Sequence, residues 1–133
     1  MGAVEGLGQV IPEDSFASNI GIKVETFEKD HAVFTMEITK FCLNYYHIVH
    51  GGVYFTLADS AAGAAARSDG RKYVTLDSGF HFLRPASGSR LRAEGVLVRR
   101  GRTTCLVRAD VTDETGKLLA TGDFTYYCVE GKP

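Results

Sequence analysis

The stretch NYYHIVHGGVYFTLADSAAGAAARSDG, residues 44–70, decides the fold of this 133-residue chain. Residues 51–68 contain no proline, and Leu57 and a run of alanines dominate them, which predicts a long helix. Gly70 is well placed to end it. Because the helix is apolar nearly all round and its side chains are small, we expect it to lie close against other structure, with no wet face of its own.

The sequence on both sides of this helix alternates with the period of β-strands. Residues 21–39 predict a hairpin with EKDH as its turn, and Ala32, Phe34 and Met36 share one face. Four more strands are predicted over residues 72–83, 90–100, 102–112 and 117–129. In the first of these, one face is expected to hold Val74, Leu76, Ser78, Phe80 and Phe82.

The order of elements, two strands, one helix and four strands, predicts the α+β class. Tight turns between successive strands favour an antiparallel sheet, and a sheet with one apolar face needs a cover that the helix alone can supply. The chain has 44% apolar and 23% charged residues and no internal repeat, so we expect one domain over residues 1–133. Residues 1–20 form a lead in which Pro12 and the two acids after it suit the first turn of a short helix.

Charge and cysteine usage exclude several classes of function. A net charge of −1 gives no field that would attract nucleic acid or an anionic membrane. The N-terminus has neither a basic start nor a long apolar run, so we expect a cytoplasmic protein without a signal peptide or membrane span. Cys42, Cys105 and Cys128 lack the spacing of a disulfide framework or a zinc site, which predicts buried, reduced thiols and no metal.

Asp59 is a single acid among the alanines of the predicted helix. At about 100° per residue it shares its face with Gly52, Phe55 and Ala62, none of which can neutralise a charge. The face could open to solvent, or the carboxylate could bond to a backbone group. The alternative is a working group, because an ionised carboxylate in apolar surroundings needs donors.

Two glycines begin the same helix. The amides of Gly51 and Gly52 lie where backbone N–H groups have no intrahelical partner and the helix dipole is positive, so they could form an oxyanion hole; a tight turn into the helix would use the same residues. Gly52 and Asp59 are about 10 Å apart along the helix, too far to serve one carbonyl. Two antiparallel copies could combine them, which predicts a homodimer with composite sites.

These motifs together resemble a known family. The pattern consists of Asn44, HGG at 50–52, LAD at 57–59, VT at 74–75, FLRP at 82–85 and GR at 101–102. It is similar to the hotdog-fold acyl-CoA thioesterases of the phenylacetate-degradation (PaaI-like) type, over roughly residues 20–128. The resemblance implies a long helix wrapped by a curved antiparallel sheet, assembly into dimers and often tetramers, and hydrolysis of acyl-CoA without metal, with coenzyme A present only as part of the substrate.

The resemblance also implies roles for six residues. Asp59 would be the general base or nucleophile, and Gly51 or Gly52 would give the oxyanion amide. Asn44 and His50 would orient the thioester or the motif loop, and Thr75 would offer a hydroxyl near the acid. For the last three a plainer role stays open, namely loop stabilisation, helix capping and ordinary strand packing.

One departure from the family pattern lies in the loop before the helix. His47 stands where members commonly have glycine, and we expect it to be exposed, although a contact to substrate is the alternative. Three tyrosines of this segment could line an acyl pocket or pack at a dimer seam, namely Tyr45, Tyr46 and Tyr54.

Seven arginines and one acid fall between residues 84 and 108. Coenzyme A carries phosphates, and Arg84 and Arg102 are the first candidates to meet them because both lie at turns. The plainer interpretation is the wet face of a strand, which would hold Arg90, Arg92, Glu94 and Arg100.

The sequence thus predicts an acyl-CoA thioesterase. Two alternatives remain at this stage. One is a hotdog enoyl-CoA hydratase or dehydratase, which would pair an acid with His47, His50 or His81. The other is an acyl-CoA-binding module without catalysis.

Overall fold

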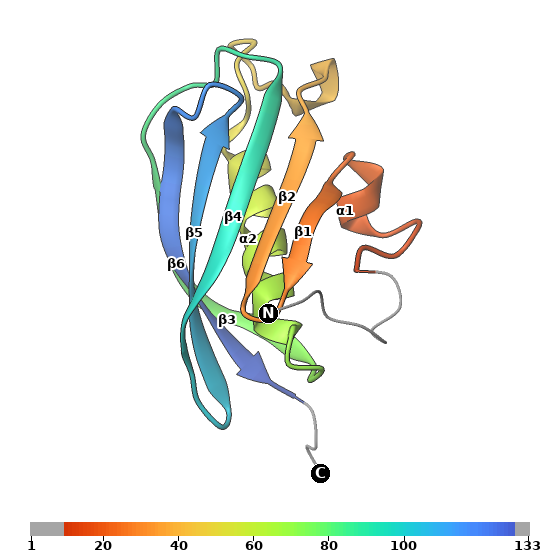
Figure 1. The fold of residues 1–133 in the computed structure, drawn as a ribbon. Helices are drawn as coiled ribbons and strands as arrows, with labels where there is room; N and C mark the ends of the chain where they lie inside the picture. The colour runs from red at the N-terminus through yellow and green to blue at the C-terminus, as the bar shows by residue number, and fades with distance from the viewer. Residues whose placement is uncertain (1–9, 130–133) are drawn as a thin grey trace.

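A computed structural model describes residues 10–129 as one curved antiparallel sheet around one long helix, α2 (Figure 1). The sheet has six strands in the order β1-β2-β4-β5-β6-β3. The helical elements are α1 Phe16–Asn19, η1 Lys40–Cys42 and α2 Gly51–Arg67, and the strands are β1 Lys23–Glu28, β2 His31–Glu37, β3 Tyr73–Phe82, β4 Arg90–Arg100, β5 Thr104–Asp113 and β6 Leu118–Cys128. The predicted α+β hotdog architecture and its element order are confirmed.

Helix α2 begins and ends where the sequence predicts, within one residue. His50 caps it, because the Nδ1 atom of His50 accepts a hydrogen bond from the Gly52 N–H at 2.8 Å. At the other end Gly70 has φ +90, a conformation that glycine adopts without strain. No helix within residues 10–129 has the length and apolar content needed to cross a membrane.

The core lies between α2 and the face of the sheet that curves around it (Figure 1). Its largest fully buried side chains include Phe34, Leu57, Leu91 and Phe124. The helix contributes mostly alanines, so its backbone comes very close to β4: a Cβ added at Gly95 would lie 2.9 Å from the Ala61 carbonyl oxygen. The expected close contact of helix and sheet is therefore confirmed.

The two elements predicted before α2 differ in accuracy. The β1–β2 hairpin turns at residues 29 and 30 as predicted, with Asp30 at φ 66. The prediction that Pro12 and the acids after it form the first turn of a short helix is wrong. That helix begins at Phe16, because Ser15 caps it by accepting from the Ser18 N–H. Residues 1–9 of the predicted lead lie outside the described residues.

A bulge in β3 changes which side chains face the core. Thr75 pairs with Tyr126 and Asp77 with Thr125, so Leu76 is an extra residue in the ladder. Val74 and Leu76 are consequently 51% and 60% exposed, and the prediction that they share a face with Phe80 is wrong. Thr75 points toward α2 instead.

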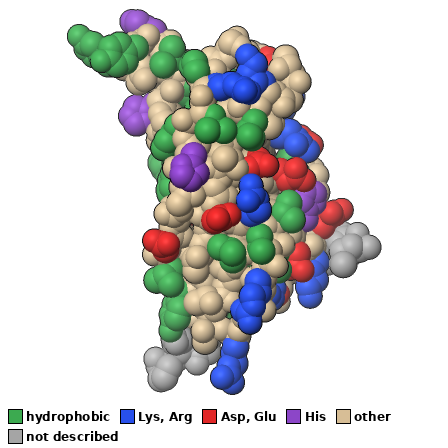
Figure 2. Space-filling view, turned by 90° about the vertical axis from the view of Figure 1, so that its left-hand side faces the viewer, with side chains coloured by type: hydrophobic (Ala, Val, Ile, Leu, Met, Phe, Trp, Pro, Cys, Tyr) green, Lys and Arg blue, Asp and Glu red, His purple; other side chains and the backbone are tan. Residues whose placement is uncertain are grey.

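A second bulge, between Leu97 and Arg99 of β4, changes which face of the sheet the last side chains of that strand point to. Arg90 and Arg92 lie on the outer face as predicted, where they pair with glutamates of β2 and β1. The same prediction is wrong for Arg100, because after the bulge this residue pairs in register with buried Cys105 and its side chain points inward. On the side of the molecule where β6 lies, charged and hydrophobic side chains are mixed on the surface (Figure 2).

The three cysteines are free and buried, as the sequence predicts.

Candidate active site

Asp59 lies in the middle of α2 and is half-buried, and within residues 10–129 only one of its two carboxylate oxygens has hydrogen-bond partners. Its Oδ1 accepts hydrogen bonds from the Thr75 hydroxyl at 2.9 Å and from the Tyr126 hydroxyl at 2.7 Å. Among the described residues no group donates to Oδ2. The carboxylate therefore has the donors that its apolar helix cannot supply, and the expected hydroxyl of Thr75 beside the acid is confirmed.

Tyr126 was not predicted as a site residue. It lies on β6, is 2% exposed, and donates to both Oδ1 and the backbone oxygen of Asp59. Burial, together with the negative charge of Asp59, raises the pKa of Tyr126 far above its ordinary value, so the phenol keeps its proton and acts as a donor. The pairing of Thr75 on β3 with Tyr126 on β6 places this tyrosine beside the acid, and the register of two strands cannot be predicted from the local sequence.

The N-terminal turn of α2 has one amide without an acceptor. The Gly52 N–H donates to the His50 ring and the Val53 N–H donates to the His50 carbonyl at 2.9 Å. The Gly51 N–H has no hydrogen-bond acceptor within residues 10–129. Of the two predicted oxyanion donors, the Gly52 amide is thus occupied and the Gly51 amide is available, while His50 has the capping role that the sequence left open.

Asn44 organises the loop that leads into this turn. Its Oδ1 accepts from the Tyr46 N–H at 2.8 Å and the Ile48 N–H at 3.2 Å, which closes the loop on itself. His47 within that loop has φ 65 and is exposed, as predicted. This left-handed conformation favours glycine, which would explain the glycine that the resemblance implies at this place in the family.

A groove of about 290 Å³ lies beside Gly51. Its walls are mainly apolar and are formed by Ile48, Val49, Tyr54, Phe82, Leu83, Arg84 and Pro85. Tyr54 is buried and donates to the Arg84 carbonyl at 3.1 Å. Tyr45 and Tyr46, in contrast, are 89% and 75% exposed and line no part of this groove.

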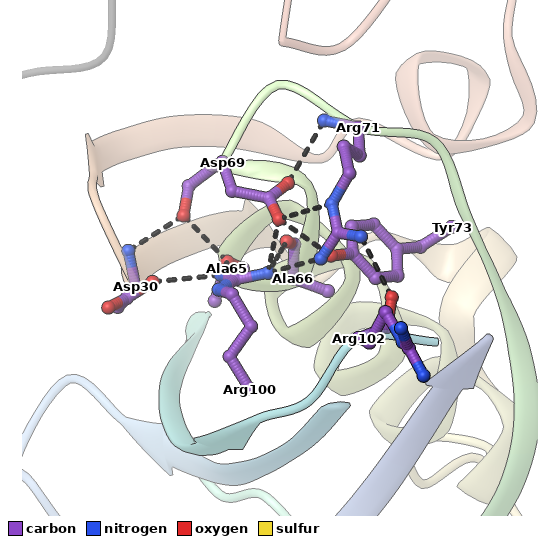
Figure 3. A network of polar contacts seen from close by, with 9 residues as sticks. Asp30, Ala65, Ala66, Asp69, Arg71, Tyr73, Arg100 and Arg102 are labelled. Atoms are coloured by element: carbon purple, nitrogen blue, oxygen red, sulfur yellow. Dashed lines mark hydrogen bonds and ion pairs between the residues drawn. The ribbon is translucent and has the colours of Figure 1, made fainter. Parts of the chain in front are cut away.

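The two arginines proposed for coenzyme A phosphates are separated. Arg84 borders the groove at Gly51, is exposed, and donates through Nη1 to the Leu118 carbonyl at 3.2 Å. Arg102 lies at the opposite end of α2, where its carbonyl accepts from Arg71 (Figure 3). Of these two arginines, Arg84 is the one that lies near Gly51, the candidate oxyanion donor, within one protomer.

Arg100 forms a partly buried ionic network at the C-terminal end of α2 (Figure 3). It donates to Asp69 at 2.9 Å, to Asp30 at 2.8 Å and to the last carbonyls of the helix. Burial opposes ionisation of Asp69, but hydrogen bonds from Tyr73 and Arg71 and the charge of Arg100 outweigh it and lower the pKa of that carboxyl. Burial and the bond to Asp69 raise the pKa of Tyr73 to about 12. The network fastens the end of the helix that is remote from Gly51.

The histidines bear on the hydratase alternative. Within residues 10–129 no hydrogen bond or ion pair joins His47, His50 or His81 to an acidic side chain. His31 does contact two acids, Glu94 at 2.7 Å and Glu28 at 3.3 Å, but on the outer face of the sheet. The structure therefore gives no histidine–acid pair at the groove.

Comparison with known proteins identifies the family of the chain. The sequence model of the thioesterase superfamily matches residues 46–120. Acyl-coenzyme A thioesterase PaaI of Escherichia coli K12 is 32% identical over 108 residues, which cover 80% of this chain and 77% of that protein. The solved structure of E. coli PaaI, from the phenylacetic acid degradation operon, matches with a TM-score of 0.85 and 28% identity over 90% of this chain and 87% of that one. A hypothetical thioesterase of Streptococcus pneumoniae TIGR4, solved with coenzyme A, matches with a TM-score of 0.81 and 32% identity over 86% and 91%.

Proposed function

Because this chain belongs to the thioesterase superfamily, we propose that it hydrolyses an acyl- or aryl-CoA thioester to the free acid and coenzyme A. The observation that carries the proposal is Asp59: two hydroxyls hold its Oδ1 and leave Oδ2 free to react. The coenzyme A bound to the S. pneumoniae relative supports the choice of thioester.

In the proposed reaction the Gly51 N–H donates to the carbonyl oxygen of the thioester. The positive end of α2 adds to the stabilisation of the negative charge that develops there. Asp59 either removes a proton from water as the water attacks the carbonyl carbon, or attacks that carbon itself to give a mixed anhydride that water then opens. In both routes the C–S bond breaks and coenzyme A leaves as the thiol. Single turnover in ¹⁸O-labelled water separates them, since only the anhydride route places the label in Asp59.

The site needs two copies of the chain. Gly51 and Asp59 are eight residues apart, about 12 Å along one helix, whereas both must lie within about 3 Å of the reacting group or its water. Asp59 is fastened to β3, which is an edge strand with Val74 and Leu76 exposed. A second copy along this edge would bring its Gly51 toward Asp59, so we propose a homodimer with two composite sites, able to pair further into a tetramer.

The first experiment measures thiol release from aryl-, short-chain and long-chain acyl-CoA. Purified wild type and Asp59→Asn are compared, with the oligomeric state checked by light scattering. We expect turnover of at least one class, reduced about 100-fold or more in the variant. Unchanged turnover in Asp59→Asn would show that another residue carries the chemistry. If wild type binds acyl-CoA without hydrolysing it, the protein is an acyl-CoA-binding module and the proposed hydrolase activity is wrong.

Subunit complementation tests the composite site. Asp59→Asn supplies an intact Gly51, and Gly51→Pro, which lacks the amide N–H, supplies an intact Asp59. In a random mixture roughly half of the dimers are mixed and each has one intact site, so about one quarter of wild-type turnover should return. A site contained within one protomer would give no recovery, because every chain carries one lesion.

A further inference from the structure

We propose that Tyr126 is a positioning residue, whose hydroxyl fixes Asp59 so that Oδ2, and not Oδ1, is the oxygen that acts on the substrate. This inference rests on the proposed function and goes beyond it by naming the reacting atom and the group that selects it.

The hydroxyl of Tyr126 joins two parts of the same residue. It lies 2.7 Å from Oδ1 and 2.9 Å from the backbone oxygen of Asp59. The terminal torsion of an aspartate is broad and roughly two-fold, so an unrestrained carboxylate exchanges its two oxygens readily. A donor fixed to both the backbone oxygen and Oδ1 opposes that exchange, and Thr75 strengthens the same choice with its bond to Oδ1.

The ring that carries this hydroxyl is buried and closely packed. Tyr126 is 2% exposed, and its ring stacks on Phe124 with the centroids 6.3 Å apart. Across the ring lies Gly63 of α2, where an added Cβ would be 3.6 Å from the Tyr126 Cε1 atom. Thr75, by comparison, is exposed on an edge strand. The tyrosine therefore defines where Oδ1 lies, and the threonine adds a second bond to an oxygen already placed.

The test compares Tyr126→Phe with wild type and with Tyr73→Phe as a matched control. Tyr73→Phe also removes a tyrosine hydroxyl from an aspartate, but that aspartate is Asp69, remote from Asp59. Thiol release is measured over a range of substrate concentrations, which gives kcat and KM separately, and thermal melting reports on the fold of each variant.

For Tyr126→Phe we expect kcat to fall about 10-fold with KM changed by less than about two-fold, because misplacing the reacting oxygen affects the chemical step more than binding. Tyr73→Phe should keep both kcat and KM.

A double variant keeps the inference testable if Tyr126→Phe also loses stability. Thr75→Val removes the other donor to Oδ1, so the two substitutions together should lower kcat by more than the product of their separate effects. Losses that simply multiply, or a kcat of Tyr126→Phe equal to that of wild type while Asp59→Asn is inactive, would overturn the inference and leave the proposed function standing. Full activity of Asp59→Asn would remove both.

Discussion

The deletion of one backbone N–H tests the N-terminal end of α2 more directly than any side-chain change. In the first turn, His50 already accepts from the Gly52 and Val53 amides, and only the Gly51 amide lacks an acceptor among the described residues. Gly51→Pro removes that donor. Proline is favoured at the first helical position, and His50 at φ −65 and ψ 137 already has the extended conformation that a following proline requires.

The size of the effect follows from how few donors are available. With the neighbouring amides occupied, proline removes the only candidate of this turn, and the loss of one oxyanion donor lowers kcat about 10²–10³-fold, or about 2.7–4 kcal/mol. Gly51→Ala is the control, because it adds a similar Cβ and keeps the N–H. That Cβ would meet the Phe82 ring at 3.3 Å, and Phe82 is half-exposed and can move. We expect the alanine variant to stay within about three-fold of wild type.

The assay is thiol release from the acyl-CoA that wild type hydrolyses fastest, with dimer content and melting temperature measured for each variant. The expected result is a kcat for Gly51→Pro far below that for Gly51→Ala, at equal dimer content. If the proline variant is folded and dimeric and turns over as fast as the alanine variant, the Gly51 amide does not bind the oxyanion, and the mechanism proposed above is wrong.

Four further predictions concern packing, charge and substrate binding. Gly95→Ala should destabilise the fold by about 1–3 kcal/mol in urea titration, because its Cβ meets the helix backbone at 2.9 Å, whereas Gly63→Ala, with ordinary contacts from 3.6 Å, should be neutral or stabilise by up to about 1 kcal/mol. Burial lowers the pKa of His31, but Glu94 and Glu28 beside it more than offset this, so the pKa of His31 is raised on folding. The two ion pairs therefore stabilise the fold fully below the unfolded-state pKa of His31, and this stabilisation is lost as the pH rises through its folded-state pKa. His31→Gln should cost about 0.5 kcal/mol more at pH 5 than at pH 9. Arg100→Met should cost about 1–2 kcal/mol, because it leaves the partly buried carboxylates of Asp30 and Asp69 without their cation, yet should preserve kcat per folded dimer. Arg84→Gln should raise KM for acyl-CoA about three-fold to ten-fold and leave KM for a truncated pantetheine thioester unchanged, if Arg84 meets the phosphates as proposed.

The elements predicted correctly from sequence are those whose signals are local. The alanine run from Ala58 to Ala66 defines a helix that must be buried, and a helix of that kind has room for few polar residues, so Asp59 stands out without any coordinates. Glycines before the run and Gly70 after it mark its ends. Strand alternation and turn residues predicted the number of strands and their order along the chain, because both depend on neighbours in sequence, but not the order in the sheet, where β3 pairs with β6.

The features that could not be predicted depend on contacts between strands. Nothing in the sequence of β4 marks the extra residue that turns Arg100 inward, so strict alternation assigned it to the wet face. In the sequence, Tyr126 cannot be told apart from an ordinary core residue. Its hydrogen bond to Asp59 is seen only once the strand register places it beside Thr75. The capping of Gly52 by His50 was one of several possibilities until the ring position was known.

The bulge in β3 connects the chemistry of the site with the proposed assembly. Without the extra residue, alternation would direct Val74 and Leu76 toward the core and turn the Thr75 hydroxyl away from Asp59. With it, Thr75 reaches the carboxylate at 2.9 Å, and the two apolar side chains are left 51% and 60% exposed, which forgoes about 2 kcal/mol of hydrophobic burial in an isolated protomer. An exposed apolar edge strand is also a template for pairing with another chain. A second copy along β3 would cover these side chains and bring its own Gly51 to the reacting oxygen, so the irregularity that supplies a donor to Asp59 also supplies the surface on which the proposed composite site depends.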